Sequence, residues 1–408
     1  MEFQPSLRFA VMSDIHLKDC PSVERLRLRQ ALDVAAAFAA GDKLYPHLDA
    51  LCVVGDFTDN GTEIQLREMK KILDAHLPSE TKRILSMAGH DYFTHGIEPA
   101  QQMLRDIFGV QPDCHEVING YHFISVSSGK SDTAKRDGFD EAKRAFYRDA
   151  IAEAERDHPS RPIFTFQHPH PSKTCYGSAK TWGTPDLLDI QRQHPRLFVF
   201  SGHSHAPIND PRSIDQRDFT SVNTGTMKYF ELDEFDKVYG TCPPGQELAA
   251  QFHIVEADEA GRVRLIAYDL ITDRPFGAPI LLGPDWRKDA FTCTGTRPGS
   301  DAVPYFRSGD RISIVSAGRS SVTFRFPQAQ IDAFRVNAYY MSVFNADGSE
   351  EKRESIWSGY YFNDMPPVLH WRIEGLKSNT PYTLELRAES FWRRLSAPLR
   401  AVFTTTAE

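Results

Sequence analysis

Residues 7–16 of the chain read LRFAVMSDIH. The run Leu7–Met12 has the apolar content of a buried β-strand, and Asp14 and His16 follow it directly. Polar side chains behind a buried strand lie at its carboxyl end, where open α/β sheets form their ligand-binding crevice. The stretch therefore predicts an α/β sheet with a reactive edge, provided that other strands end in the same way.

Four further apolar runs end in residues that bind metals or transfer protons. LCVVG (51–55) precedes Asp56, ILSMAG (84–89) precedes His90 and Asp91, IFTFQ (163–167) precedes His168, and LFVFSG (197–202) precedes His203 and His205. A single histidine in such a place is ordinarily a core or loop residue, and Asp56 alone could be a turn residue. Five strands ending alike are poorly explained by chance, so we predict that these side chains meet.

Helical spacing alternates with these strands. The stretches 22–40, 62–76 and 140–156 have the periodicity of amphipathic helices, with Ser22 as a plausible N-cap and Gly41 as a stop signal. Strands that alternate with helices indicate βαβ units and a parallel or mixed sheet. Between residues 219 and 282 the runs FTSVNTG, FHIVEA, VRLIAYDL and APILLG predict short strands that complete a second sheet.

From residue 311 onward the sequence changes character and contains strand patterns only. Six such runs are RISIVS, SVTFRF, FRVNAYYMSVF, HWRIEGL, YTLELRAE and RAVFTTT. Short strands separated by turns predict a second, smaller all-β sandwich domain. We place the boundary near residues 284–304, giving domains at 1–290 and 300–408. Within the second domain, Leu376 to Tyr382 resembles the tyrosine corner of a fibronectin type III sandwich, whose tyrosine hydroxyl bonds back to the chain upstream.

Composition narrows the class of protein. The formal net charge of −8 and the absence of a basic tract argue against nucleic acid as a partner. No apolar run approaches the ~20 residues of a membrane-spanning helix, so no membrane association is predicted. The N-terminal residues show no leader pattern, which predicts a cytoplasmic location unless a leader has been removed. The six scattered cysteines are typical of reduced thiols.

The ligand types predict the cofactor. Imidazole and carboxylate groups without a thiolate suit Mn, Fe or Zn. Two aspartates and four histidines are too many for one four-coordinate ion, but they suffice for two ions that share a carboxylate. Two ions ~3.5–4 Å apart can hold both the attacking and the leaving oxygen of a displacement at phosphorus. The predicted cofactors are therefore two divalent transition metal ions.

The ordered set Asp14-x-His16, Gly55-Asp56-x-x-Asp59, His90-Asp91, His168 and Gly202-His203-x-His205 resembles the calcineurin-like metallophosphoesterase superfamily. The resemblance implies a four-layer αββα fold with a dinuclear site at the top of two sheets. It also implies a role for each residue. Asp14, His16 and His205 would hold the first metal, Asp56 would bridge, His168 and His203 would hold the second metal, and His90 would act at the leaving oxygen, oriented by Asp91.

One position departs from the family pattern. The family has Gly-Asn before the His-Asp pair, and this chain has Ala88-Gly89. Either the asparagine became glycine beside a Gly-to-Ala change, or it was deleted after Gly89. The resemblance implies that its amide oxygen ligates the second metal. We therefore expect second-ion binding to be weaker by about 10–100-fold, by analogy with outer-shell losses, and asparagine at Gly89 to restore it.

These observations predict a hydrolase that cleaves a small-molecule phosphate monoester or diester by attack of a metal-bridging hydroxide. Nucleotides remain open as substrates, because specificity depends on loops that one sequence does not explain. The alternative is a catalytically impaired relative that acts as a metal-binding, phosphate-binding or protein-interaction module. The oligomeric state is not predicted.

Overall fold

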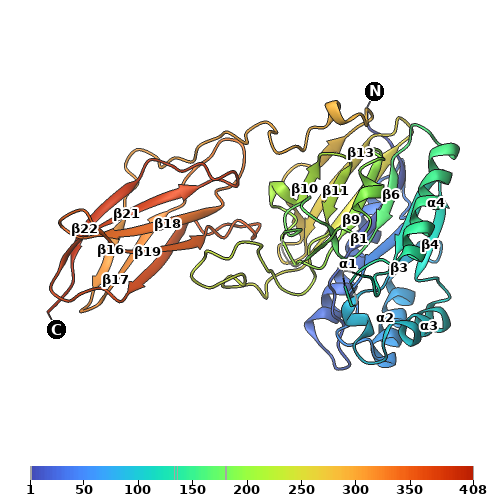
Figure 1. Cartoon of the computed structure of the whole chain (residues 1–408), viewed down its shortest axis with the longest axis horizontal. Helices are drawn as coiled ribbons and strands as arrows, with labels where there is room; N and C mark the ends of the chain where they lie inside the picture. Colours follow the sequence, from blue (N-terminus) through green and yellow to red (C-terminus); the bar gives the residue numbers. More distant parts are fainter. Residues whose placement is uncertain (1, 133, 136, 180–181, 408) are drawn as a thin grey trace. The chain divides into compact units, whose positions relative to one another are not determined.

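The computed structural model of the chain describes residues 2–132, 134–135, 137–179 and 182–407. The chain divides into two compact units (Figure 1). The first unit comprises Met1–Asp233 and Gly245–Thr294, and the second comprises Glu234–Pro244 and Gly295–Glu408. The short segment Glu234–Pro244, which lies between the two stretches of the first unit, thus belongs to the second unit, and a single boundary along the sequence does not describe this division.

Two mixed sheets form the centre of the first unit. In the first sheet β1 (Pro5–Met12), β2 (Ala50–Val54) and β3 (Lys82–Ser86) are parallel, and β12 (Gln251–Asp258), β13 (Val263–Asp269), β14 (Arg274–Pro275) and β15 (Ile280–Leu282) are added by antiparallel pairing. In the second sheet β5 (Tyr121–Val126), β6 (Ile163–Phe166), β9 (Leu197–Ser201) and β11 (Thr220–Asn223) are parallel, with β4 (Asp113–Ile118) and β10 (Ile214–Gln216) antiparallel at the edges. Strands β7 (His170–Pro171) and β8 (Gly183–Thr184) form a separate pair.

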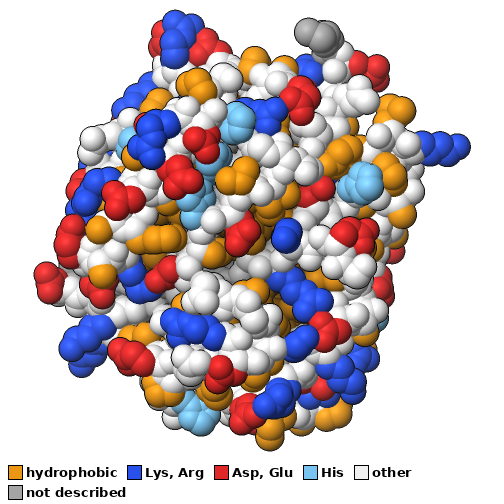
Figure 2. All heavy atoms as spheres, turned by 90° about the vertical axis from the view of Figure 1, so that its right-hand side faces the viewer, with side chains coloured by type: hydrophobic (Ala, Val, Ile, Leu, Met, Phe, Trp, Pro, Cys, Tyr) orange, Lys and Arg blue, Asp and Glu red, His pale blue; other side chains and the backbone are white. Residues whose placement is uncertain are grey.

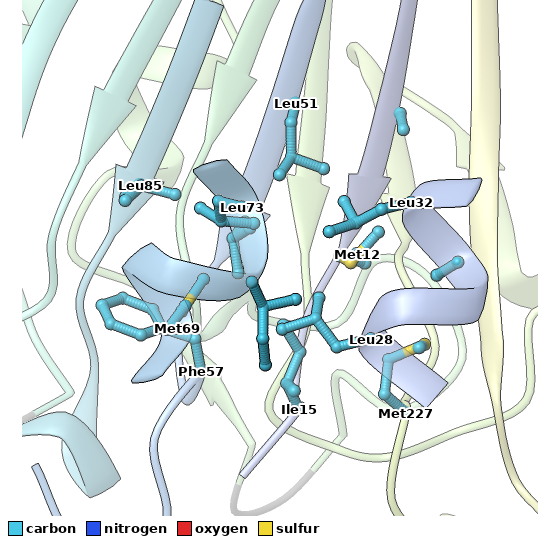
Figure 3. Close-up of a cluster of buried hydrophobic side chains, with 14 of the residues drawn as sticks. Met12, Ile15, Leu28, Leu32, Leu51, Phe57, Met69, Leu73, Leu85 and Met227 are labelled. Carbon is cyan, nitrogen blue, oxygen red and sulfur yellow. The ribbon is translucent and has the colours of Figure 1, made fainter. Parts of the chain in front are cut away.

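Three layers of buried side chains show how the unit is stacked. Between the sheets, the Phe9 ring lies 5.0 Å from the rings of both Phe123 and Phe164. On the outer face of the first sheet, side chains of α1 (Val23–Gly41) and α2 (Glu63–His76) point toward Met12, Leu51 and Leu85, as Figure 3 shows. On the outer face of the second sheet, α4 (Glu141–Asp157) and α5 (Leu188–Gln191) cover the strands. This order confirms the predicted four-layer αββα fold.

The three predicted helices are present with their predicted starts. Thr62 caps α2 by accepting a hydrogen bond from the backbone N–H of Gln65 at 3.3 Å, and Asp140 caps α4 by accepting from Lys143 at 3.0 Å. Ser22 precedes α1 without a side-chain cap. Within the described residues, no helix combines the length and apolar character needed to cross a membrane.

Some elements differ from the prediction. Of the runs at 219–282, only β11 lies in the second sheet; β12, β13 and β15 join the first sheet instead. The pattern of apolar residues identifies a strand but not its partner, and β12 pairs with β1, about 245 residues distant along the chain. The helix α3 (Ile97–Phe108), the edge strand β4 and the strand β19 (Glu350–Trp357) were not predicted. The sequence EEKRESIW of β19 is highly charged because this strand lies at a sheet edge.

The second unit is an all-β region built from two antiparallel sheets. One sheet has the order β16 (Ser313–Ala317), β17 (Ser321–Pro327), β20 (Val368–Glu374), and the other has the order β19, β18 (Ala338–Phe344), β21 (Pro381–Glu389), β22 (Leu399–Thr404). Inward side chains of both sheets form one core. The Tyr382 hydroxyl accepts a hydrogen bond from the backbone N–H of Lys377 at 3.0 Å, which confirms the predicted upstream bond.

We expect Tyr382→Phe to destabilise the second unit by about 1–3 kcal/mol, because the Lys377 N–H loses its partner while the ring stays in place. Scanning calorimetry of the full chain should show one transition at a lower temperature. Tyr305→Phe is the matched control, since the Tyr305 hydroxyl bonds Asp332 at the surface. Equal shifts for both variants would contradict a structural role for the corner bond.

Candidate metal centre

The six predicted metal ligands and the predicted catalytic residue His90 lie at the carboxyl ends of parallel strands from both sheets. Asp14 and His16 follow β1, Asp56 follows β2, and His90 follows β3 on a short 3₁₀ turn (η1, Gly89–Tyr92). From the second sheet, His168 follows β6, and His203 and His205 follow β9. Because the two sheets pack face to face, these seven side chains converge. They form three groups whose ligand atoms lie within 4.8 Å of one another: Asp14, His16 and His205; His16, Asp56 and His90; Asp56, His168 and His203.

Five of the predicted ligands have left-handed backbone conformations. The φ angles are 52° at Asp14, 50° at His16, 49° at Asp56, 75° at His203 and 54° at His205. Residues with side chains rarely adopt this region, and such strain is retained mainly at functional sites. The shared conformation turns each side chain from the strand end toward the same point.

Glycine allows the two sheets to approach at this point. Gly55 has φ +76°, and a Cβ there would lie 2.5 Å from the His168 ring. A Cβ at Gly202 would lie 2.6 Å from Oδ2 of Asp14. Any side chain at either position would therefore displace a predicted ligand, which explains why both loops carry glycine immediately before an aspartate or histidine.

Asp14 is the centre of the first group. Its Oδ2 accepts hydrogen bonds from the Ser13 hydroxyl at 2.5 Å and from the backbone N–H of His203 at 3.0 Å. Its Oδ1 lies 3.2 Å from Nε2 of His205, and Nε2 of His205 lies 3.2 Å from Nε2 of His16. One oxygen is thus fixed by the protein, and the other lies within 4.0 Å of the Nε2 atoms of three imidazoles, those of His205, His168 and His16.

Asp56 is the centre of the second group. Its Oδ1 accepts a hydrogen bond from the backbone N–H of His90 at 2.9 Å, and its Oδ2 lies 3.1 Å from Nε2 of His168. The His203 ring lies 4.8 Å from the His168 ring, centroid to centroid. Asp56 belongs to two of the three ligand groups, as a carboxylate shared between two ions would.

Backbone carbonyls fix the orientation of the imidazoles. Nδ1–H of His168 donates to the carbonyl of Val54 at 2.8 Å, and Nδ1–H of His205 donates to that of Tyr229 at 3.1 Å. When the proton is on Nδ1 of a neutral imidazole, Nε2 carries the lone pair that can bind a metal. This is the arrangement of metal-binding histidines. In both residues this Nε2 is the atom that faces a carboxylate.

The electrostatics of the cluster fit a cation. Within the described residues, the buried atoms Asp14 Oδ1 and His168 Nε2 have no hydrogen-bond partner. Burial alone would lower the pKa of His168, but the carboxylates of Asp56 and Asp14 raise this pKa to about 10. The metal-free cluster therefore takes up a proton where a divalent ion would bind. Both oxygen and nitrogen donors suit a divalent transition metal.

Comparison with known proteins agrees with this geometry. Residues 7–207 match the family model of the calcineurin-like phosphoesterases. The first unit is a metallophosphoesterase domain. No curated protein matches the chain.

Three solved structures resemble parts of the chain. The structure titled "GAP50 the anchor in the inner membrane complex of Plasmodium" is 12% identical, with 65% of this chain and 85% of that chain covered and a TM-score of 0.45. The crystal structure of FN3tt is 17% identical, with 26% and 98% covered and a TM-score of 0.19. A computationally redesigned β-sandwich protein is 18% identical, with 26% and 91% covered and a TM-score of 0.19. None of the three indicates an activity for this chain.

Asp91 does not orient His90 in this metallophosphoesterase domain, so the predicted role of Asp91 was wrong. The Nδ1–H of His90 donates instead to the carbonyl of Asp59 at 2.9 Å. The buried Asp91 carboxylate accepts from the backbone N–H groups of Asp56 and Ala88 at 3.0 Å, from the N–H of Thr58 at 2.9 Å, and from the Thr58 hydroxyl at 2.6 Å. Asp91 therefore positions the loop that carries Asp56.

Two residues near the ligands have supporting contacts. Both nitrogens of His170 bond serine hydroxyls, Nδ1 with Ser201 at 2.7 Å and Nε2 with Ser204 at 2.8 Å, so this histidine has no nitrogen free for a metal. Asp59 lies 3.6 Å from Nδ1 of His16 and forms an ion pair with Lys228 at 2.8 Å. Lys228 was not predicted, because it follows no strand end and carries no motif.

In the structure, the carboxylate of a distant residue lies against Gly89, where the chain departs from the family pattern. A Cβ at Gly89 would lie 2.9 Å from Oδ2 of Asp137, a residue that the sequence analysis did not single out. The expectation that asparagine at Gly89 would restore a ligand stays a prediction, and the Asp137 carboxylate would have to shift to make room for that side chain. Asp137 lies in a polar loop between a strand and a helix, and no local pattern distinguishes it from solvent-exposed acids.

We expect Asp91→Ala to weaken Mn²⁺ binding by about 10–100-fold, the range for outer-shell partners, because the Asp56 loop loses three hydrogen bonds and Ala88 loses one. Isothermal titration calorimetry measures this affinity. Asp149→Asn, an exposed carboxylate on α4, is the control. Unchanged affinity in Asp91→Ala would contradict the positioning role.

We expect Mn²⁺ binding to release a proton and to strengthen as the pH rises. The pKa of His168, about 10 without metal, means that the imidazole is protonated at pH 7, and metal binding needs the neutral form. Affinity should rise by about tenfold per pH unit for one proton released. Calorimetry in buffers of different ionisation enthalpy counts the protons; a binding enthalpy independent of buffer would contradict the prediction.

Proposed function

We propose that the protein is a dinuclear metal-dependent phosphoric ester hydrolase that acts on a small-molecule monoester or diester. The observation that carries the proposal is the shared position of Asp56, which lies within ligand distance of both His16 and the pair His168 and His203. One carboxylate between two sets of imidazoles supports two ions rather than one. The ligand set supports Mn, Fe or Zn.

When bound, a pair of divalent ions supplies charge to a phosphate oxygen and lowers the pKa of coordinated water. The residues of the chain would hold the ions and keep their own side chains oriented. Asp14, His16 and His205 would hold one ion, His168 and His203 would hold the other, and Asp56 would be shared by both. The carbonyls of Val54 and Tyr229 keep the imidazoles in the correct tautomer, so that no reorientation is needed when a substrate arrives.

His90 is the proposed proton donor to the leaving oxygen. Its ring lies 4.4 Å from the His16 ring, centroid to centroid, and His90 is more exposed than most of the proposed ligands. The carbonyl of Asp59 holds Nδ1–H, so Nε2 is free to exchange a proton with solvent and substrate. The backbone N–H of His90 donates a hydrogen bond to Oδ1 of Asp56. This bond fixes the position of His90 relative to the carboxylate that the two ions would share.

Charge supports a small substrate over a nucleic acid. The net charge is −8, and on the face drawn in Figure 2 the lysine and arginine side chains alternate with aspartate and glutamate. A protein that binds a phosphate backbone usually presents a continuous basic surface. Small phosphate esters, including nucleotides, need only the local charge of the metal site.

The second unit is proposed to be a fibronectin type III-like sandwich. Its strand orders, with three strands in one sheet and four in the other, and the bond of the Tyr382 hydroxyl to Lys377 support this assignment. In the described residues of this unit, no group of metal-ligand side chains is found. Its proposed role is binding of a partner rather than catalysis.

The proposal is tested with p-nitrophenyl phosphate and bis-p-nitrophenyl phosphate in the presence of Mn²⁺. Hydrolysis that requires the metal supports the enzyme, and the faster of the two esters decides between monoesterase and diesterase. Tight Mn²⁺ binding without hydrolysis of either ester would overturn the proposal in favour of an impaired relative that binds metal or phosphate.

We expect His90→Ala to lower kcat by about 10²–10⁴-fold, the usual contribution of a general acid, with the Mn²⁺ content unchanged. The loss should be larger for phenyl phosphate than for p-nitrophenyl phosphate, because the poorer leaving group depends more on protonation. His95→Ala, an exposed histidine on the same segment, is the control. Equal losses for the two esters would contradict the acid role.

A further inference from the structure

The carboxylate of Asp137 lies against Gly89, the position at which the family pattern has its asparagine. A Cβ built at Gly89 would lie 2.9 Å from Oδ2, 3.2 Å from Oδ1 and 3.4 Å from Cγ of Asp137. The space in which an asparagine side chain would begin is therefore already filled by a carboxylate. Glycine at position 89 is what admits it.

The loop that carries Asp137 is fixed at its base. Gly129 and Gly138 exchange two backbone hydrogen bonds, at 2.8 and 3.0 Å, which close the segment between β5 and α4. The backbone N–H of Phe139 donates to Asp186 at 2.8 Å, and Asp140 caps α4. Asp137 directly precedes Gly138, one of the two hydrogen-bonded glycines. Its backbone position is therefore set by the segment that leads into α4.

Oδ1 of Asp137 is held by two donors. The backbone N–H of Gly89 donates to it at 3.0 Å, and the Ser128 hydroxyl at 3.1 Å. Within the described part of the chain, Oδ2 accepts no hydrogen bond. Asp14 is likewise anchored through one oxygen, with the difference that Asp14 is fully buried and Asp137 is half-buried.

The charge of Asp137 acts on the histidines of the second group. Burial and the charge of His168 lower the pKa of His203, and Asp137 is the largest of the influences that oppose this, ahead of Asp56 and Asp14. Asp137 also helps to raise the pKa of His168. The Asp137 carboxylate therefore acts electrostatically on both histidines, although it is not among the three groups whose ligand atoms lie within 4.8 Å of one another.

We infer that Asp137 is a protein ligand of the second metal ion, through Oδ2, in place of the asparagine that the sequence lacks. The inference rests on the proposed dinuclear function. Unlike a neutral amide, a carboxylate adds a negative charge to the site, so the second ion should bind at least as tightly as it would to the usual set. The departure at Ala88-Gly89 is then an exchange of ligand rather than a loss.

Mn²⁺ titration by calorimetry, together with metal analysis, tests this with variants of the full chain. Asp137→Asn keeps an oxygen for the Gly89 and Ser128 donors but turns an NH₂ group toward the ion, so loop geometry is retained while the ligand is lost. We expect second-ion affinity to fall by at least about 10–100-fold in Asp137→Asn and Asp137→Ala, with the first ion retained. Asp132→Asn, an exposed acid of the same loop, is the matched control.

A reciprocal exchange adds a second measurement. Gly89→Asn alone should weaken second-ion binding, because its side chain displaces Asp137. Gly89→Asn combined with Asp137→Ala should bind the second ion more tightly than Asp137→Ala alone, because the amide then has the vacated space. Absence of this gain would overturn the idea that the two positions serve one ligand site.

The outcomes separate this inference from the proposed function. A wild-type chain that binds fewer than two Mn²⁺ ions would overturn both. A wild-type chain that binds two ions, with second-ion affinity unchanged in Asp137→Asn and Asp137→Ala, would overturn the role of Asp137 and leave the dinuclear proposal standing. Retention of the first ion shows that each variant is folded.

Discussion

The first unit is organised around charge that its own side chains do not neutralise. Asp14 and Asp56 are buried among imidazoles, Asp14 Oδ1 has no donor among the described residues, and the carboxylates raise the pKa of His168 to about 10. Removing a carboxylate from water is unfavourable unless a counter-charge accompanies it. A divalent cation would supply that charge, and the loops around the cluster would keep the ligand groups in place for it.

Holding such a cluster requires both strain and rigidity. Five of the proposed ligands have left-handed backbone conformations, and two glycines are needed where the sheets meet. Conformations of this kind persist only where the surrounding structure over-determines them. Here the aromatic layer between the sheets, with Phe9, Phe123 and Phe164 in contact, provides a packed foundation directly below the strand ends. The stability of the core thus offsets the cost of the site.

Hydrogen-bonded carboxylates organise the loops around the ligands. Asp91 accepts hydrogen bonds from the backbone N–H groups of Asp56, Thr58 and Ala88. Asp137 accepts hydrogen bonds from the backbone N–H of Gly89 and the hydroxyl of Ser128. Both act on the short segment after β3 in which the chain departs from its family pattern. When this sequence is compared with the family pattern position by position, the asparagine is missing from this segment. The space beside Gly89 is nevertheless occupied. The carboxylate of Asp137, almost fifty positions downstream, lies there.

The sequence by itself determined the existence of the αββα unit, the β-sandwich region and three helices, and it identified the residues behind five strands that the fold brings together. These follow from local patterns: apolar period, caps, and the polar residue that ends each buried run. Only the tertiary structure decided that β12 pairs with β1, that Asp91 bonds the Asp56 loop instead of the His90 ring, and that Asp137 lies on Gly89. Each of these is a contact between segments far apart along the chain or a choice among equivalent hydrogen-bond partners. Such contacts are fixed by the packing of the whole unit, and no periodicity in the sequence encodes them.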